Sequence, residues 1–324
     1  MPAAVGYHCS HEQLSPSALL DHVQQAQRAG FQAAMCSDHF HPWLPSQGQS
    51  GFSWSWLGAA MQATGLSFGT VCAPGQRYHP AIIAQAAATL AEMFPGRFWL
   101  AIGSGEALNE RINGAAWPEK SQRNARLREA AEVIRALWAG ETVSHQGCFT
   151  VRQARLYSRP VSPPQLFGAA LTAETARWMG SWADGLITAG SSLDGLRKVV
   201  DAFRNGGGAG KPLALQTAVS LASSRSQALA AAHDQWRHAA LAADQIANLA
   251  TPEEFAAACR PVTPDSLADK LLLATRVQEL WDWLEQAAGL GFDHIYLHQI
   301  NRDAVPQFIE ACGESLRRQP AFAS

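Results

Sequence analysis

The stretch PAIIAQAAATLAEMFPGRFWLAIGSGE, residues 80–106, contains the unit from which the fold of this chain is inferred. Its first part, Pro80 to Met93, predicts a helix with proline in the first turn. The apolar run from Arg97 to Ile102 predicts a buried strand, which leads directly into the glycine-rich segment Gly103–Glu106. A helix, a buried strand and a polar turn in this order are typical of α/β proteins with a parallel sheet.

Similar units lie on both sides of this stretch. Eight apolar runs predict strands at residues 3–8, 32–37, 66–73, 97–102, 165–170, 185–188, 213–221 and 294–300. Eight strands that each lead into a helix predict a TIM-like (β/α)8 barrel of the α/β class, as a single domain over residues 1–324. A doubly wound sheet is the alternative, but no Gly-x-Gly-x-x-Gly motif opens a first strand-to-helix turn.

Three stretches are too long for ordinary connections, namely residues 40–53, 141–164 and 235–265. They predict insertions after strands 2, 4 and 7 of the barrel. Residues 141–164 alternate between polar and apolar, which is typical of a hairpin. Long insertions after barrel strands usually build the mouth of the active site, so we expect these three to do so.

Composition excludes several classes of function. The chain has 25 Lys and Arg against 27 Asp and Glu, so its formal net charge is −2 and nucleic acid or an anionic membrane is not an expected partner. We expect no signal peptide, because residues 1–6 lack a positively charged start followed by an apolar run, and no run of about 18 apolar residues predicts a membrane span. The six cysteines show no CxxC spacing, which favours reduced thiols. We therefore expect a cytoplasmic protein that acts on a small molecule.

Polar residues collect where the predicted strands end, which is where barrel enzymes place their chemistry. Asp38 and His39 leave the second strand together, so that the acid can bind a cofactor or fix a loop and the imidazole can move protons. After the fourth strand, the glycines of 103–106 allow close approach of a ligand, and Glu106 is placed to act as an acid or base. The structural alternative is a helix start capped by Ser104.

Six motifs resemble those of the bacterial luciferase-like flavin and deazaflavin oxidoreductases, in particular the F420-dependent glucose-6-phosphate dehydrogenase group. They are SDHFHPW (37–43), FSWSW (52–56), RYHPAIIAQAAATL (77–90), AIGSGEALNE (101–110), LREAAEVIRALWAGE (127–141) and WADGLIT (182–188). The resemblance is good to about residue 190 and weaker beyond it.

The resemblance implies a cofactor ring in the mouth of the barrel, a homodimer, and three groups of site residues. The catalytic residues are His39 as a base or transition-state stabiliser, Glu106 as an acid, and Trp43 on the reacting face. The cofactor-binding residues are Asp38, Thr70, Val71, Ser104, Gly105, Asn109, Ala169 and Ala170. The substrate-side residues are Trp43, Trp54, Trp56, Thr188, Ser191 and Lys270. The family position that matches Thr70–Val71 carries a non-prolyl cis peptide bond.

Two differences between this sequence and the F420-dependent group bear on which cofactor it binds. Residues 169–173 read Ala-Ala-Leu-Thr-Ala where the group has a Gly-Gly-Pro loop, and Ser191 stands where the group has a lysine. Both changes reduce the means of binding a phosphate. We therefore predict an FMN-dependent oxidoreductase or monooxygenase, with a flavin reductase as a further partner that supplies reduced flavin. Coenzyme F420 is the alternative cofactor, in an F420-dependent dehydrogenase or reductase.

Two other classes remain open. His39 and His41, with His8, His79 and His298, could hold a metal in a hydrolase on the same barrel. A flavin carrier without turnover is the second alternative, although a carrier needs neither His39 nor Glu106. The main prediction includes no metal. Of the 11 tryptophans, we expect Trp43, Trp54 and Trp56, joined by Trp117, to wall a flavin or substrate pocket.

Overall fold

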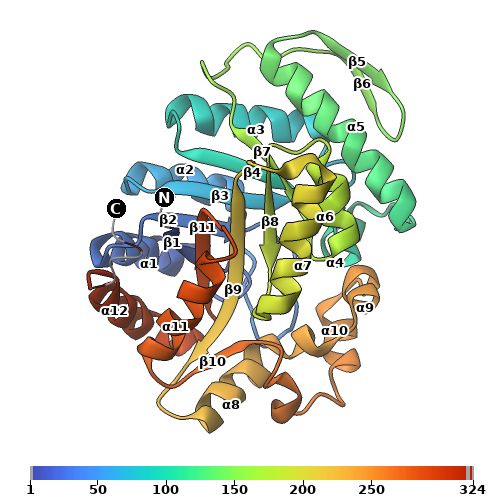
Figure 1. The fold of residues 1–324 in the computed structure, drawn as a ribbon. Helices are drawn as coiled ribbons and strands as arrows, with labels where there is room; N and C mark the ends of the chain where they lie inside the picture. The colour runs from blue at the N-terminus through green and yellow to red at the C-terminus, as the bar shows by residue number, and fades with distance from the viewer. Residues whose placement is uncertain (1–2, 319–321, 323–324) are drawn as a thin grey trace.

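Eight parallel strands close into a barrel in the computed structural model, which describes residues 3–318 and 322 (Figure 1). Each strand pairs with its neighbours in chain order, and pairing of the first with the last completes the ring. The predicted barrel and its eight strands are confirmed. They are β1 (Ala4–Cys9), β2 (Ala33–Ser37), β3 (Ser67–Cys72), β4 (Phe98–Ile102), β7 (Gln165–Ala169), β8 (Gly185–Ala189), β9 (Leu213–Leu221) and β11 (His294–Gln299).

Eight helices surround the strands. Local sequence sets their ends: α1 begins at the cap Ser15, whose hydroxyl accepts from Ala18 N, and stops at Gly30 with φ 107°. The helices are α1 (Pro16–Ala29), α2 (Ser53–Ala63), α3 (Pro80–Met93), α5 (Lys120–Ala139), α6 (Ala173–Gly180), α7 (Leu193–Phe203), α11 (Val277–Ala288) and α12 (Val305–Leu316). Short helical turns lie at Arg111–Asn113, Arg204–Gly208, Arg237–Ala240, Pro264–Leu267 and Arg302–Ala304.

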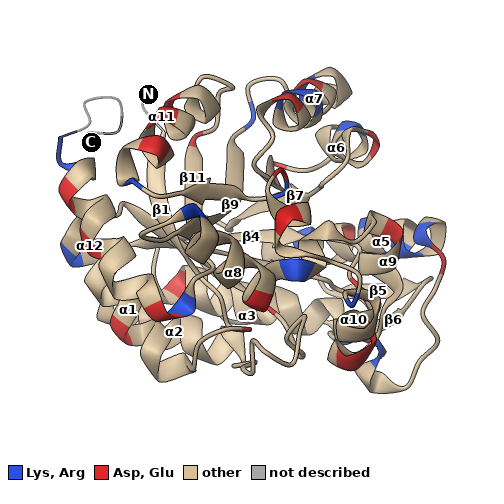
Figure 2. Cartoon of the chain, turned by 90° about the horizontal axis from the view of Figure 1, so that it is seen from below, with Lys and Arg blue, Asp and Glu red and all other residues tan. Residues whose placement is uncertain are grey.

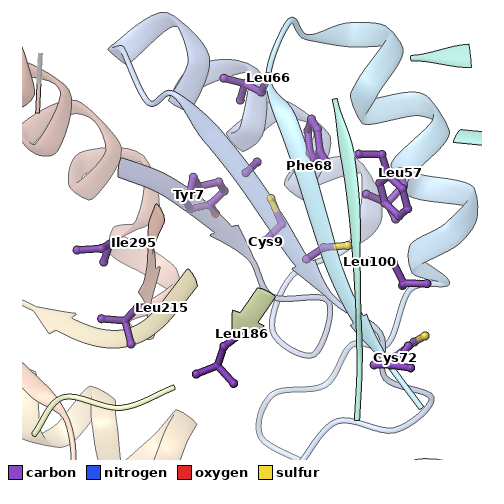
Figure 3. Close-up of a cluster of buried hydrophobic side chains, with 14 of the residues drawn as sticks. Tyr7, Cys9, Leu57, Leu66, Phe68, Cys72, Leu100, Leu186, Leu215 and Ile295 are labelled. Atoms are coloured by element: carbon purple, nitrogen blue, oxygen red, sulfur yellow. The ribbon is translucent and has the colours of Figure 1, made fainter. Parts of the chain in front are cut away.

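The main core lies between the strands and the helices. Alternate strand residues point outward, and Figure 3 shows Tyr7 and Cys9 of β1 and Phe68 of β3 on this side, with Leu57 of α2 nearby. These side chains are buried. Because this layer takes every second strand residue, the residues between them must face the interior of the barrel.

The base of the barrel interior is filled by aromatic side chains. Trp99 packs on Phe167 and donates a hydrogen bond to the Tyr296 hydroxyl over 3.2 Å. Gly69 makes room for the Trp99 ring, because a Cβ on Gly69 would overlap it. Ligands therefore have access only from the carboxyl end of the strands, which we call the mouth together with the loops that follow it.

The predicted hairpin in residues 141–164 exists, as β5 (Val143–Gln146) and β6 (Thr150–Ala154). It lies against the outer side of α5, where His145 Nε2 is 2.8 Å from Glu129 Oε2 (Figure 1). The expectation that this stretch builds the mouth is therefore wrong. The hairpin follows the helix α5 rather than a strand. Because the helices run antiparallel to the strands, the hairpin starts at the end of the barrel opposite the mouth.

The insertion after the seventh barrel strand is larger than predicted and covers the mouth. It contains α8 (Arg225–Trp236), α9 (Ala243–Asn248) and α10 (Pro252–Ala258), which lie together at the lower end of the barrel in Figure 1. It ends in the short strand β10 (Leu272–Ala274), which was not predicted and pairs with the end of β9. Across the mouth, α9 contacts the one-turn helix α4 (Ala107–Glu110).

Charged side chains lie outside the barrel strands themselves. The barrel strands contain no Lys, Arg, Asp or Glu, and Figure 2 shows the charged positions on helices and loops around tan strands. None of the helices in the described ranges is long and apolar enough to cross a membrane.

Candidate active site

Small side chains from four adjacent strands form one half of the interior surface at the mouth. Val71 and Ala169 pack directly on the filled base of the barrel. Gly103 follows Trp99 and Ala101 on the interior side of β4, and Ala189 follows Ile187 on that side of β8. We call these four residues the small-residue floor. All four are at least partly exposed, so a flat ring can rest on them.

The other half of the mouth is polar. His8, Ser37, Gln216 and His298 stand at the matching interior positions of β1, β2, β9 and β11. The His8 and His298 rings lie 4.7 Å apart, and His298 Nδ1 lies 3.4 Å from Gln216 Nε2. The mouth thus has an apolar side for a ring and a polar side for proton transfer and hydrogen bonding.

His39 lies beside a buried carboxylate that the sequence analysis did not select. Glu12 Oε1 is 3.5 Å from His39 Nε2, and Glu12 Oε2 accepts hydrogen bonds of 2.7 Å from both Ser10 and Ser37. Burial alone would raise the pKa of Glu12, but His39 and the two hydroxyls outweigh burial and lower this pKa to about 2. Glu12 is therefore an anion placed beside the His39 imidazole.

Asn109 joins the two predicted catalytic residues. Its Oδ1 accepts from Phe40 N over 2.9 Å, which turns its NH2 group toward His39 Nδ1 at 3.2 Å and Glu106 Oε2 at 3.4 Å. The carbonyl oxygen of His41 lies 3.3 Å from the same His39 Nδ1. This nitrogen therefore faces one donor and one acceptor, so it can either accept a hydrogen bond from Asn109 or donate one to the His41 carbonyl.

Asp38 is held by a buried network next to the mouth. Its carboxylate accepts from Ser53 over 2.7 Å and from Tyr78 over 3.1 Å, and it pairs with Arg77 at 3.0 Å. Glu110 pairs with the same guanidinium at 3.4 Å. Burial lowers the pKa of Arg77, but the two carboxylates and Tyr78 outweigh it and raise that pKa. Of the two roles predicted for Asp38, these contacts show that it fixes the loop after β2. The other role, a contact with the cofactor, stays a prediction.

The predicted residues Trp43, Ser104 and Gly105 lie at the mouth. Trp43 is 4.8 Å from the His39 ring, stacks on His238 at 4.9 Å and 11°, and contacts Phe255 edge-on. Gly105 has φ +80°, and a Cβ on it would lie 3.0 Å from Ala73 Cβ. An apolar wall from the insertion after β9 thus faces the catalytic pair.

At the rim of the mouth, the Ser191 hydroxyl donates to Lys270 O over 3.3 Å. These two predicted substrate-side residues are therefore neighbours. Trp117, in the loop after α4, donates to Asn248 of α9 over 3.1 Å and so links the two sides of the mouth.

Three predicted residues face the helices instead. Thr70 alternates with Val71 and donates to Cys36 O over 3.2 Å on the outer side of the sheet. Ala170 belongs to the outer core, and Thr188 shares the outward direction of Leu186. The structure therefore does not bring these side chains to the mouth. The described chain contains no cis peptide bond, so the cis bond expected at Thr70–Val71 is wrong.

Trp54 and Trp56 also lie away from the mouth. Both are in the outer core on α2, where Trp54 packs near Phe98 and Trp56 packs near Phe68. Trp56 Nε1 donates to Pro16 O over 3.0 Å. Of the predicted tryptophan wall, the structure places Trp43 at the catalytic residues and Trp117 at the rim.

Four other buried histidines have pKa values below the ordinary value of imidazole. Burial is the main cause: it lowers the pKa of His11 to about 4 and those of His238 and His298 to about 3, and it lowers the pKa of His8 strongly. His238 comes from the insertion after β9, and the residues around it in the sequence form no motif that indicates a functional site. Glu12 could have been found as an acid in the loop after β1.

The metal alternative finds no support in the geometry. Within residues 3–318 and 322, no three His, Cys, Asp or Glu side chains are placed to hold a metal ion. His41 Nδ1 lies 2.9 Å from Leu108 O, and His79 caps α3 while its Nε2 lies 2.9 Å from Thr150 O. The five histidines of that alternative therefore do not converge.

Comparison with known proteins identifies the family. Residues 1–294 match the family described as luciferase-like monooxygenase. The chain belongs to this family. It is therefore a luciferase-like oxidoreductase, and the carboxyl end of its barrel carries the residues through which it resembles the family.

Relatives of this luciferase-like chain include several F420-dependent enzymes. The F420-dependent glucose-6-phosphate dehydrogenase of Segniliparus rotundus is 33% identical over 96% of this chain and 96% of the relative. The F420-dependent hydroxymycolic acid dehydrogenase of Mycobacterium tuberculosis is 39% identical over 74% of this chain and 69% of the relative. A solved F420-dependent secondary alcohol dehydrogenase, in complex with an F420–acetone adduct, has a TM-score of 0.91 and 30% identity, with 100% of both chains covered.

The residues at the mouth fit a flat tricyclic ring. The small-residue floor carries no side chain larger than valine. Next to it, His8 Nδ1 is buried and has no protein partner, so a polar atom remains for a ligand or water. Val71, Gly103, Ala169 and Ala189 would lie under such a ring, with His39 and Glu106 among the polar groups around it.

Proposed function

We propose that this luciferase-like enzyme is an F420-dependent dehydrogenase that oxidises a secondary alcohol. The observation that carries the proposal is the end-to-end similarity to the F420-dependent secondary alcohol dehydrogenase, at 30% identity and a TM-score of 0.91. The curated relatives are also named as F420-dependent enzymes. F420 is the alternative cofactor of the sequence analysis, and these relatives support it better than FMN.

The catalytic groups support oxidation of an alcohol. F420, when bound, supplies a deazaflavin carbon that accepts a hydride. His39 takes the hydroxyl proton, and the Glu12 carboxylate at 3.5 Å stabilises the imidazolium that forms. Asn109 keeps His39 and Glu106 in a fixed relation through its NH2 group. Glu106 is the second proton-transfer group.

The surroundings of His39 favour an uncharged substrate with an apolar substituent. Trp43, Leu44, Leu108 and Phe255 belong to one apolar cluster over the mouth. Glu12 supplies a negative charge 3.5 Å from His39, which disfavours an anionic substrate there. Lys270, the cation predicted on the substrate side, lies exposed at the rim. We therefore propose a neutral secondary alcohol over a sugar phosphate.

The proposal also covers assembly and location, for which the chain itself gives no direct observation. We retain a homodimer and a cytoplasmic location as proposals. A flavin reductase is not needed in this scheme, because the alcohol itself reduces the cofactor.

Titration and turnover test this function together. Purified protein is titrated with F420 and, separately, with FMN, and the cofactor fluorescence is followed. Secondary alcohols of increasing chain length and glucose 6-phosphate are then compared as reductants of F420 by the loss of its absorbance. We expect binding of F420 and turnover with the alcohols. Binding of FMN without binding of F420 would overturn the proposal.

A further inference from the structure

A buried chain of amide and imidazole groups runs from the insertion after β9 to the mouth. Gln235 Nε2 donates to Ser46 O over 3.1 Å, so its Oε1 is the acceptor that Gln13 Nε2 reaches at 3.0 Å. Gln13 Nε2 also donates to Ile300 O over 3.0 Å. Both donations go to unambiguous acceptors, so they fix which end of the Gln13 amide is nitrogen.

The orientation of Gln13 determines the tautomer of His298. Because the Gln13 nitrogen is committed, its Oε1 must accept from His298 Nε2, which lies 2.6 Å away. His298 therefore carries its proton on Nε2, and in the neutral ring Nδ1 is an acceptor. The group facing Nδ1 at 3.4 Å must then be the NH2 of Gln216.

This assignment leaves the Gln216 oxygen facing the mouth. Gln216 shares the interior direction of Ala214, and its backbone pairs with Ala189 at the edge of the small-residue floor. Its side chain is partly exposed, and no described residue donates to its Oε1. The chain of three fixed groups thus holds a hydrogen-bond acceptor beside the place where a ring would rest.

We propose that Gln216 is a cofactor-binding residue whose Oε1 accepts a hydrogen bond from the ring N3–H of the deazaflavin. This inference rests on the proposed function, which places such a ring on the floor. The pyrimidinedione part of a deazaflavin has one N–H donor between two carbonyl oxygens. An amide oxygen with a fixed direction matches that donor, and a free rotor at the same position would lose more entropy on binding.

Ligand methylation and mutation together test the contact. The probes are the deazaflavin core of F420, without phosphate and glutamates, and the same core methylated at N3. Dissociation constants are measured by quenching of ligand fluorescence, without turnover. In the wild type, methylation should weaken binding about three- to tenfold, which is the usual contribution of one hydrogen bond. In Gln216→Ala, binding of the unmethylated core should weaken by a similar factor, and methylation should then have little further effect.

Two control variants separate the contact from general damage. Gln216→Met keeps the length of the side chain and should behave like Gln216→Ala. Thr217→Val changes a buried hydroxyl on the opposite face of the same strand, so its dissociation constants should match the wild type. An equal methylation penalty in the wild type and in both Gln216 variants would overturn the inference. Failure of the wild type to bind either F420 or its core would instead reject the proposed function.

Discussion

The carboxylate of Glu12 and the imidazole of His39 face each other at 3.5 Å, with Glu12 buried and His39 at the mouth. The two residues come from the loops after β1 and β2, which are neighbouring strands. Ser37 is the last residue of β2, and its hydroxyl donates a hydrogen bond to Glu12. This contact anchors the pair to the barrel. A charge held in this way changes both the chemistry and the acid stability of the protein.

Glu12 makes the folded state sensitive to acid. Its pKa is lowered from 4.5 to about 2 in the folded protein, so its stabilising contribution is complete above 4.5 and is lost as pH falls toward 2. A shift of this size corresponds to about 3 kcal/mol. The stability difference between wild type and Glu12→Gln, measured by urea unfolding, should shrink by up to that amount as pH falls through this range. A constant difference would contradict the assignment.

Asn109 should control the reaction rate as a positioning residue. Asn109→Ala removes the group between His39 and Glu106, so we expect kcat for F420 reduction to fall by about ten- to a hundredfold. The pH profile of kcat should also shift, which a purely structural role would not cause. The matched control is Asn113→Ala, an exposed asparagine that bonds Gln76 O and Ala115 N, and it should leave kcat unchanged. Equal kcat in Asn109→Ala and the wild type would refute this role.

Arg77 should be essential for stability. Arg77→Met leaves the buried carboxylates of Asp38 and Glu110 without their cation, so it should cost about 3–5 kcal/mol in urea unfolding. The control is Arg128→Met, which breaks the exposed pair with Glu132 and should cost about 0.5 kcal/mol or less. Similar costs for the two variants would show that the buried network is not required.

Two glycines should respond in opposite directions to alanine. Gly69→Ala forces a Cβ into the Trp99 ring and should cost about 1–3 kcal/mol. Gly58 lies inside α2, where a Cβ would point into open space, so Gly58→Ala should stabilise the protein by about 0.5–1 kcal/mol. Thermal unfolding of both variants checks the signs, and a stable Gly69→Ala would contradict the packing of the barrel base.

The barrel could be predicted because its strands carry a local signal. β9, for example, was predicted with the bounds Leu213–Leu221 that the structure shows. The three-residue strand β10 gives no periodic pattern, because it only extends the edge of β9 outside the barrel. The place of the hairpin was missed for a different reason: it depends on which end of the barrel a loop leaves, and not on the loop's own residues.

The candidate site was predicted in part. His39, Glu106 and Asn109 are together, since all three follow strands whose carboxyl ends must meet. Thr70 and Val71 were selected as a pair although neighbouring strand residues point to opposite faces, so the resemblance alone could not separate them. Gln216 and His238 were missed because their roles depend on contacts between segments that are far apart in the chain.

The ring of Trp99 against Tyr296 at the base of the barrel has a kinetic consequence. Because the barrel interior is filled at its base, ligands can enter and leave only through the mouth, and two ligands bound together would use the same opening. In the proposed reaction, a cofactor ring on the small-residue floor would lie deeper in the mouth than the substrate. If the proposed dehydrogenase reaction takes place here, we therefore expect an ordered mechanism, in which the cofactor binds first and the oxidised product leaves before the reduced cofactor.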